Sequence, residues 1–347
     1  MKIQKAELAA KLNKIKGVVP KKDTRAVLQG VLVKEGYLIA NNLEMTVKAK
    51  LEGIGDECFI IPERAFDLIN NLPDGEVDIS VTGKNTITIK EDKIKNKYQT
   101  FDPAQFPDTT AQEDENRLAI KADMLLESIK RVSYAISPQG NSVMGAMCLQ
   151  ASGGKLNFVG LDGHVLAWDR VEYDGEFELL IPKNTVEKLK SLGLSGDVQI
   201  RHSRAAAVFA TEDFEVYTRL VEGEYYKYQT MFKELPLHTA VPRMELLEAM
   251  TRAKMCTEEK SPVRFGIDGS SLSLSIKDSK TDYLETLDLQ EGLTEPLTIG
   301  FDARLVLETL KAFDCGSVGI SFGGPKMPMI VEAEDSDFKA IVLPVAI

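Results

Sequence analysis

The sequence predicts an α+β fold made of three tandem copies of one unit, each with two helices packed on antiparallel sheets. Two observations predict this fold: a strand–helix–strand pattern occurs three times, and its spacing along the chain is nearly constant. Each copy carries Gly-x-Val-x-Ile after a helix, with Val77, Val198 and Val318 at the centre. These valines are 121 and 120 residues apart. Three matches in register at one spacing indicate an internal repeat.

The repeated pattern begins with an apolar strand at Phe59, Leu179 and Leu297 and continues into a helix. The glycine that follows is expected to adopt the left-handed conformation that ends many helices. Val-x-Ile then has the two-residue period of a half-buried strand. The predicted helices present apolar stripes at helical spacing, formed by Ala65, Leu68 and Leu72 in the first copy and by Val306, Leu310 and Phe313 in the third.

A second helix is predicted earlier in each copy, near residues 5–16, 122–136 and 242–256, from apolar residues at i, i+4 and i+7. A hairpin follows each of these helices, and a glycine-containing turn separates its alternating apolar strands. The turns are expected at Glu35-Gly36, Gly153-Gly154 and Asp268-Gly269. We therefore expect about eight strands per copy and three domains, at residues 1–115, 116–237 and 238–347, with an acidic segment at the first boundary.

The composition is typical of a water-soluble globular protein, with 44% hydrophobic and 27% charged residues. No apolar run is long enough for a membrane-spanning helix, and the N-terminal segment lacks the continuous apolar stretch of a secretory signal. The four cysteines form no CxxC pair and the three histidines are scattered. We therefore expect a cytoplasmic protein with reduced thiols, no metal site and no cofactor.

The charge is unevenly distributed along the chain. The whole chain has a formal net charge of −11. Residues 1–50 contain eleven Lys and Arg residues and four acids, which gives this stretch a net charge of +7. An acidic protein with local basic surfaces remains compatible with a nucleic-acid partner.

The sequence contains few candidates for catalysis, since no phosphate-loop, dinucleotide-binding, zinc-protease or nucleophile-elbow motif is present. Asp162-Gly163-His164 is the best candidate for an acid–base pair, because histidine titrates near neutral pH. The alternative is a turn at Asp-Gly that His164 supports by hydrogen bonding. Gly323-Gly324-Pro325 is interpreted as a hairpin turn before a strand.

Beyond these patterns, the whole chain resembles the β subunit of bacterial DNA polymerase III, the replicative sliding clamp. The resemblance is carried by the threefold repeat and by short motifs distributed from end to end. These motifs are Leu43-Glu44-Met45, Phe106-Pro107-Asp108, Leu161-Asp162-Gly163-His164, Arg219-Leu220-Val221-Glu222-Gly223, Gly300-Phe301 and Val342-Leu343-Pro344.

The resemblance implies a head-to-tail homodimer that closes into a ring of six units and encircles double-stranded DNA without reading its sequence. Twelve helices packed at ~8–10 Å would line a hole roughly 25 Å wide, enough for a duplex. Basic residues recur on the predicted helices; each by itself could be ordinary solvated surface. The residues expected to face DNA are Lys11, Lys14, Lys22, Lys130, Arg131, Lys188, Lys190 and Arg252.

The resemblance also implies a pocket that receives short apolar peptides from DNA polymerase and clamp-loader subunits, although these residues could equally be ordinary core. Tyr226 stands where the family has proline, and Leu305 where tyrosine is common. The expected pocket residues are Met144, Leu161, Gly163, His164, Val165, Leu166, Tyr226, Thr230, Met231, Leu305, Met327, Ile341, Val342, Leu343 and Pro344.

For the dimer interface, the resemblance implies contact between the edge near Tyr98 and the helix end at Met255 and Cys256, although the last two could be core residues. The predicted function is a non-catalytic DNA sliding clamp, a processivity factor that tethers the replicative polymerase. Two alternatives remain: a repeat scaffold that binds proteins without encircling DNA, and an enzyme that uses Asp162 and His164.

Overall fold

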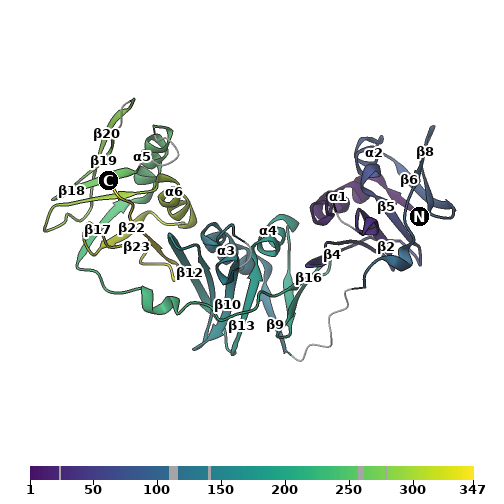
Figure 1. The fold of residues 1–347 in the computed structure, drawn as a ribbon, viewed down its shortest axis with the longest axis horizontal. Coiled ribbons are helices and arrows are strands. Elements are labelled where there is room, and N and C mark those ends of the chain that lie inside the picture. Colours follow the sequence, from purple (N-terminus) through teal and green to yellow (C-terminus); the bar gives the residue numbers. More distant parts are fainter. Residues whose placement is uncertain (23–24, 109–115, 140–141, 257–261, 278–279) are drawn as a thin grey trace. The chain divides into compact units, whose positions relative to one another are not determined.

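The computed structural model describes residues 1–22, 25–108, 116–139, 142–256, 262–277 and 280–347. The chain forms two compact units, shown with their elements in Figure 1. The N-terminal compact unit contains residues 1–126 and 187–220, and the C-terminal compact unit contains residues 127–186 and 221–347. The domain boundary predicted near residue 115 lies outside the described residues.

The strands of the N-terminal compact unit form two antiparallel sheets. One sheet has four strands in the order β1-β6-β7-β8, and the other has eight in the order β5-β2-β3-β4-β16-β15-β14-β9. The four-stranded sheet consists of β1 (Lys2–Gln4), β6 (Glu76–Gly83), β7 (Thr86–Glu91) and β8 (Ile94–Gln99). The eight-stranded sheet consists of β5 (Cys58–Pro62), β2 (Gly30–Lys34), β3 (Tyr37–Asn41), β4 (Met45–Lys50), β16 (Phe214–Arg219), β15 (Ala206–Ala210), β14 (Asp197–His202) and β9 (Asn116–Lys121).

The C-terminal compact unit has the same plan, with an eight-stranded sheet in the order β13-β10-β11-β12-β24-β23-β22-β17 and a four-stranded sheet in the order β20-β19-β18-β21. The eight-stranded sheet consists of β13 (Phe177–Pro182), β10 (Ala146–Ser152), β11 (Lys155–Leu161), β12 (Val165–Glu172), β24 (Lys339–Val342), β23 (Met329–Glu332), β22 (Ser317–Phe322) and β17 (Leu237–Pro242). The four-stranded sheet consists of β20 (Asp282–Asp288), β19 (Ser271–Lys277), β18 (Val263–Asp268) and β21 (Leu297–Phe301).

Six α-helices cover these sheets in the described part of the chain. Their apolar stripes are buried, as the sequence predicts for Leu8, Leu12 and Ile15 in the first helix. The helices are α1 (Lys5–Ile15), α2 (Phe66–Asn71), α3 (Ala122–Val132), α4 (Lys183–Leu192), α5 (Arg243–Met255) and α6 (Ala303–Ala312). Each sequence unit thus contributes two helices and eight strands to the described structure.

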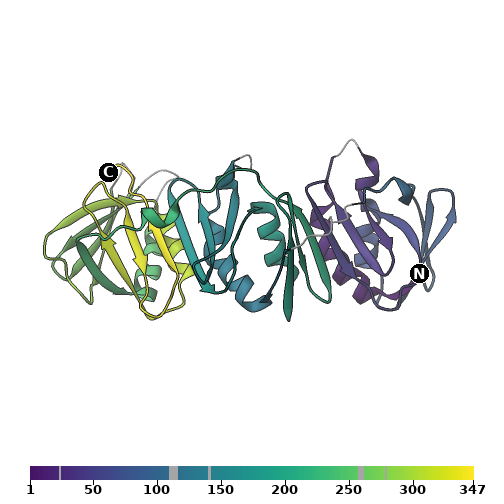
Figure 2. The same ribbon diagram turned by 90° about the horizontal axis from the view of Figure 1, so that it is seen from below.

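Both eight-stranded sheets combine strands from two sequence units. The fourth strand of the first unit pairs with the eighth of the second, with Val47 opposite Val216. In the same way, the fourth strand of the second unit pairs with the eighth of the third, with Ala167 opposite Ala340. Figure 2 shows the resulting continuity of the second sheet, where C-terminal strands in yellow lie beside teal strands.

The left-handed conformation predicted for the repeated glycine after each second helix occurs in only one of the three copies. Among Gly75, Gly196 and Gly316, only Gly196 has a positive φ, of 71°. Instead, each of the three carbonyls accepts a 2.9 Å hydrogen bond from the first backbone N–H of the same unit's first helix, at Lys5, Ala122 and Arg243. These N–H groups lack a partner within their own helices, so the shared contact fixes where each helix begins.

Local sequence also sets the length of α2, which is shorter than its predicted apolar stripe. Leu72 is buried but has an extended ψ of 151°, because Pro73 disfavours helical backbone in the residue before it. The predicted hairpin turns form at Glu35-Gly36 and at Gly153-Gly154, all with positive φ. The third turn is one residue later than predicted, at Gly269-Ser270, because β18 ends only at Asp268.

Candidate partner-peptide pocket and basic helices

An apolar pocket of about 300 Å³ opens on the C-terminal compact unit. Its walls come from the β11–β12 hairpin, the segment that follows β16, the segment before β23, and the chain after β24. The lining residues are Met144, Leu161, Gly163, His164, Val165, Leu166, Tyr226, Met231, Pro328, Ile341 and Leu343. A pocket with this lining suits a hydrophobic anchor of a linear peptide.

The β11–β12 turn forms one wall because Asp162 organises it. One carboxylate oxygen of Asp162 accepts hydrogen bonds from the backbone N–H groups of His164 and Val165, each 2.9 Å long. Gly163 has a φ of 87°, which favours glycine at this turn. The turn interpretation of Asp-Gly is therefore confirmed, and the Asp162 carboxylate is engaged by backbone rather than by the imidazole.

Strand pairing brings the distant C-terminal segment to this wall. Leu166 on β12 lies opposite Ile341 on β24, and the backbone N–H of Leu343 donates a 2.9 Å hydrogen bond to the carbonyl of His164. Residues separated by more than 170 positions in sequence thus form one continuous apolar surface.

Five of the predicted pocket residues do not line the pocket. Thr230 is exposed, and its hydroxyl donates to the Lys227 carbonyl. Leu305 is buried within α6. Val342 is fully buried, because neighbouring residues of a strand point to opposite faces and Ile341 takes the face of the pocket. Met327 and Pro344 lie outside the lining. Pro328 lines the pocket and was not predicted from the sequence; its position next to Met327 was the available signal.

Aromatic rings support the pocket from behind. Tyr228 is 1% exposed and makes a T-shaped contact with Trp168 at 5.2 Å between ring centroids. Its hydroxyl donates a 2.8 Å hydrogen bond to the side-chain oxygen of Gln150. Burial raises the pKa of Tyr225 and of Tyr228, so both phenols stay protonated. Only Tyr226 of this group reaches the pocket, where it is 40% exposed.

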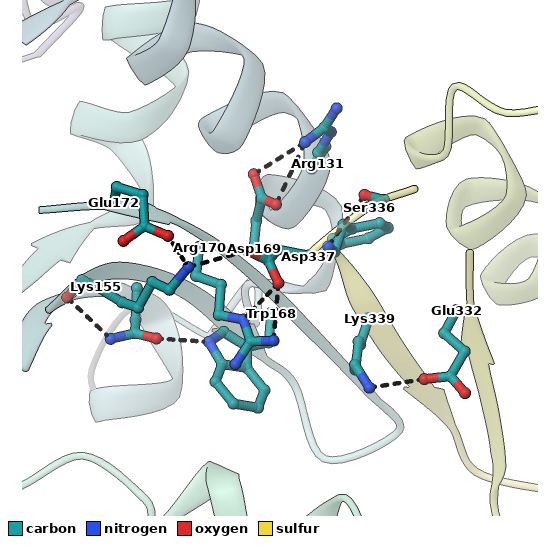
Figure 3. Close-up of polar contacts among 12 residues, drawn as sticks. Arg131, Lys155, Trp168, Asp169, Arg170, Glu172, Glu332, Ser336, Asp337 and Lys339 are labelled. Carbon is teal, nitrogen blue, oxygen red and sulfur yellow. Dashed lines mark hydrogen bonds and ion pairs between the residues drawn. The ribbon is translucent and has the colours of Figure 1, made fainter. Parts of the chain in front are cut away.

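A polar network secures the same strand pairing at the other end of β12 (Figure 3). Arg170 donates from Nε and Nη2 to one carboxylate oxygen of Asp337, at 3.1 and 2.8 Å. Lys155 also forms an ion pair with Asp337, at 3.4 Å. The Arg170 guanidinium lies 5.1 Å from the ring centroid of Trp168, so the β23–β24 hairpin is tied to β11 and β12.

The predicted DNA-facing cations fall into three groups. Four of them form ion pairs with acids: Lys11 with Asp213, Arg131 with Glu127 and Asp169, Lys190 with Glu187, and Arg252 with Glu285. Lys14 and Lys188 instead donate to backbone carbonyls. Lys22 and Lys130 are exposed. Their contact with DNA remains a prediction.

The residues predicted at the dimer interface lie at edges of the fold. Tyr98 is on β8, which ends one sheet, and Met255 closes α5 with 80% of its surface exposed. Cys256 follows Met255 and is partly exposed. Their role in dimer formation remains a prediction.

Within the described part of the chain, no cluster of three or more His, Cys, Asp or Glu side chains could hold a metal ion. Those residues also contain no helix long and apolar enough to span a membrane.

Family models match almost the whole chain in three consecutive segments. The N-terminal, central and C-terminal domains of the DNA polymerase III β subunit match residues 1–110, 119–227 and 233–346. The chain belongs to the DNA polymerase III β subunit family. The resemblance predicted from the sequence is thereby confirmed, and with it a non-catalytic sliding-clamp subunit rather than an enzyme or an unrelated scaffold.

Among relatives, the β sliding clamp of Vibrio cholerae is 23% identical over 99% of this chain and 98% of the relative. That of Pseudomonas aeruginosa is 24% identical over 98% of both chains. A putative DNA polymerase III β subunit from Eubacterium rectale superposes with a TM-score of 0.92 at 23% identity, covering 100% of this chain and 99% of the other. A sliding clamp from Bartonella birtlesii, solved bound to griselimycin, gives 0.93 at 20% identity with the same coverage. These structures confirm the predicted fold of three tandem clamp units.

Proposed function

We propose that two copies of this chain join head to tail into a ring around duplex DNA, and that the apolar pocket tethers polymerase and clamp-loader subunits by short apolar peptides. The sequence units 1–115, 116–237 and 238–347 would each supply one sixth of the ring. Because a ring holds DNA topologically, tight phosphate contacts are unnecessary and would impede sliding.

The observation that carries the proposal is a pairing rule between successive sequence units. The fourth strand of one unit pairs with the eighth strand of the next, as β4 with β16 and β12 with β24. The same rule leaves two strands without a partner of this kind, namely β20, the fourth strand of the last unit, and β8, the eighth strand of the first. Each is the end strand of its sheet. A second copy can satisfy both edges if β20 of one chain pairs with β8 of the other.

The repeat also predicts the register of this pairing. Within their hairpins, Val47, Ala167 and Tyr283 occupy equivalent positions, and so do Val216, Ala340 and Asn96. Because Val47 faces Val216 and Ala167 faces Ala340, Tyr283 of one copy should face Asn96 of the other. Asp282 would then lie opposite Lys97.

Exposed apolar residues and charge favour the same pairing. Ile94 is 36% exposed, whereas the equivalent Phe214 and Phe338 are 7% and 0% exposed inside the completed sheets. Leu284 on β20 is 69% exposed. The β8 strand carries Lys95 and Lys97, and β20 carries Asp282, Glu285 and Asp288, so opposite charges would meet across the edges.

A cysteine pair tests the ring and its register together. Asn96→Cys and Tyr283→Cys in one chain should give covalent dimers with a short thiol cross-linker, because directly opposite residues on paired strands are about 5 Å apart. Each single variant controls for the native cysteines, and Ile94→Cys with Tyr283→Cys is the out-of-register control. Equal cross-linking of the matched and offset pairs would contradict the predicted register.

Retention on DNA tests the function of the ring. The cross-linked protein, closed by its clamp loader before cross-linking, should stay on circular DNA and be lost from linear DNA with free ends. A repeat scaffold that binds without encircling would be lost equally from both, which would overturn the proposal.

A further inference from the structure

The three sequence units place a basic residue at one equivalent position of their first helices. Lys14, Arg131 and Arg252 each lie nine residues after the helix-initiating residue whose N–H binds the repeated glycine carbonyl. All three were predicted to face DNA. Their partners differ between the two compact units, and that difference separates their roles.

In the C-terminal compact unit, both arginines bind carboxylates. Arg131 contacts both carboxylate oxygens of Asp169 (Figure 3). Both distances are 3.4 Å, and Arg131 also pairs with Glu127. The Asp169 side chain is only 1% exposed. Burial raises the pKa of Asp169, although its contacts with Ser128 and Arg131 act against that rise.

Arg252 repeats this arrangement one unit later. It donates to both carboxylate oxygens of Glu285, at 3.0 and 2.6 Å. Asp169 and Glu285 occupy equivalent positions, three residues after the first paired residue of the fourth strand. Each pair therefore joins the first helix to the fourth strand of its unit, and the carboxylate compensates the positive charge of the arginine.

The first sequence unit lacks this acid. The equivalent position is Ala49, and the ammonium of Lys14 instead donates a 3.0 Å hydrogen bond to the Ser191 carbonyl in the last turn of α4. In return, Lys188 donates a 3.1 Å hydrogen bond to the Lys14 carbonyl in the last turn of α1. Helix C-termini carry only about half a negative charge, so two lysines at this junction retain most of their positive charge.

Further lysines adjoin this junction. A β-carbon placed on Gly17 would lie 3.6 Å from the Lys188 ammonium, so Lys188 reaches the chain next to Lys16. Lys16 and Lys21 are exposed and border a hollow of about 560 Å³. Among the described residues, neither lysine has an ion pair within 4 Å. Glu63 and Asp67 line the same hollow, so a phosphate would sit at its lysine rim.

We propose that the lysines at this junction contact the DNA backbone, with Lys16 and Lys21 as direct phosphate contacts. Arg131 and Arg252 are instead positioning residues that hold helix to strand. The inference rests on the proposed function, since it concerns how the ring touches DNA. A cation that neutralises a phosphate releases counterions only if its charge is not already balanced by a protein carboxylate. The charges of the two arginines are balanced by Asp169 and Glu285.

The salt dependence of duplex binding tests the inference on the full-length protein. For a fluorescently labelled duplex of arbitrary sequence, the slope of log affinity against log salt should fall by about 2 in Lys16→Gln/Lys21→Gln, about 1 for each phosphate contact. Arg131→Gln/Arg252→Gln should leave the slope unchanged while lowering the thermal unfolding midpoint. Lys48→Gln and Lys121→Gln are matched controls, because both lysines are paired with acids in the same compact unit, and neither should change the slope.

A slope that falls equally in the arginine double variant, or that stays unchanged in the lysine double variant, would overturn the inference. As a converse measurement, Glu63→Gln/Asp67→Asn should strengthen duplex binding because it removes acids beside the lysine rim. Retention of wild type on circular DNA reports the proposed function separately. If wild type is retained there but the slopes do not separate lysines from arginines, only the lysine assignment fails. If wild type neither binds the duplex nor is retained, both fail.

Discussion

The two junctions between successive sequence units share a backbone plan but differ in chemistry. Position 17 of the first junction is equivalent to position 134 of the second, since each lies twelve residues after the start of its helix. Gly17 leaves room for the Lys188 ammonium, whereas the Tyr134 hydroxyl forms a 3.0 Å hydrogen bond with the buried hydroxyl of Thr309. Burial raises the pKa of Tyr134, so this junction stays neutral.

The difference indicates how one repeated unit can serve two tasks. The first junction keeps its charge close to solvent, where it can attract a polyanion. The second is neutral, with the Tyr134 hydroxyl bonded to the buried Thr309. The pairing of β12 with β24 in the same compact unit also forms a wall of the apolar pocket. The same strand pairing thus supports a charged surface in one compact unit and an apolar pocket in the other.

The largest difference is expected for the two equivalent phenylalanines. Phe338→Ala should cost about 3–5 kcal/mol of unfolding free energy, because Phe338 is fully buried and lies 4.6 Å from the Phe313 ring. Phe214→Ala should cost less, since Phe214 keeps some exposure and has the Lys11 ammonium 4.8 Å from its ring centroid. Urea unfolding monitored by circular dichroism measures both. Equal losses would show that the two junctions are packed alike.

A smaller effect is expected when the neutral junction loses one hydroxyl. Tyr134→Phe should cost about 1–3 kcal/mol, because it leaves the Thr309 hydroxyl buried without its partner. Tyr134→Phe/Thr309→Val should recover much of this loss. At the charged junction, Lys188→Met should cost less than about 1 kcal/mol, as is usual for partly exposed charged contacts. Thermal unfolding of the four proteins provides the comparison, and a costlier Lys188→Met would reverse it.

The smallest effect is expected from the acid response of Asp337. Burial alone would raise the pKa of Asp337, but its contacts with Arg170 and Lys155 lower it overall. A carboxylate with a lowered pKa in the folded state stabilises the fold above its ordinary pKa of about 4 and loses that contribution as the pH falls through the lowered value. Asp337→Asn should therefore flatten the acid side of the stability profile.

The measurement for Asp337 is the difference in unfolding midpoint between Asp337→Asn and wild type as a function of pH. Asp169 has a raised pKa and the opposite sign, but its contribution cancels in this difference. The gap between the two proteins should narrow as the pH falls below about 4. A gap independent of pH would show that Asp337 does not stabilise the second junction through its charge.

Much of the fold could be predicted because it depends on short stretches of chain. The stripe Leu8, Leu12 and Ile15 and the alternation of Val77 and Ile79 report burial directly through their spacing. The left-handed conformation predicted for the repeated glycine was right for Gly196 but wrong for Gly75 and Gly316. The pattern locates these glycines after a helix but cannot show that their carbonyls bind the start of another helix. That contact joins residues about 70 positions apart.

The pocket was less predictable. Leu161 and Leu166 could be identified by family resemblance, but Leu305, which the same resemblance implied, is buried in α6 away from the lining. A side chain's direction depends on the rotation of its helix against neighbouring elements, and a motif does not fix that rotation. Likewise, recurrence of basic residues on the helices gave no sign that Arg131 and Arg252 are bound to Asp169 and Glu285.

By itself, the sequence determined that three similar units follow one another, with two helices and a set of amphipathic strands in each. Hydrophobic periodicity and turn residues act within a few positions, so they can be recognised directly in the sequence. Only the tertiary structure decided that the fourth strand of one unit pairs with the eighth of the next, and which cations keep their charge. Strand pairing depends on long-range packing. The charge of the cation depends on one equivalent position in the fourth strand, which is Ala49 in the first unit and Asp169 in the second.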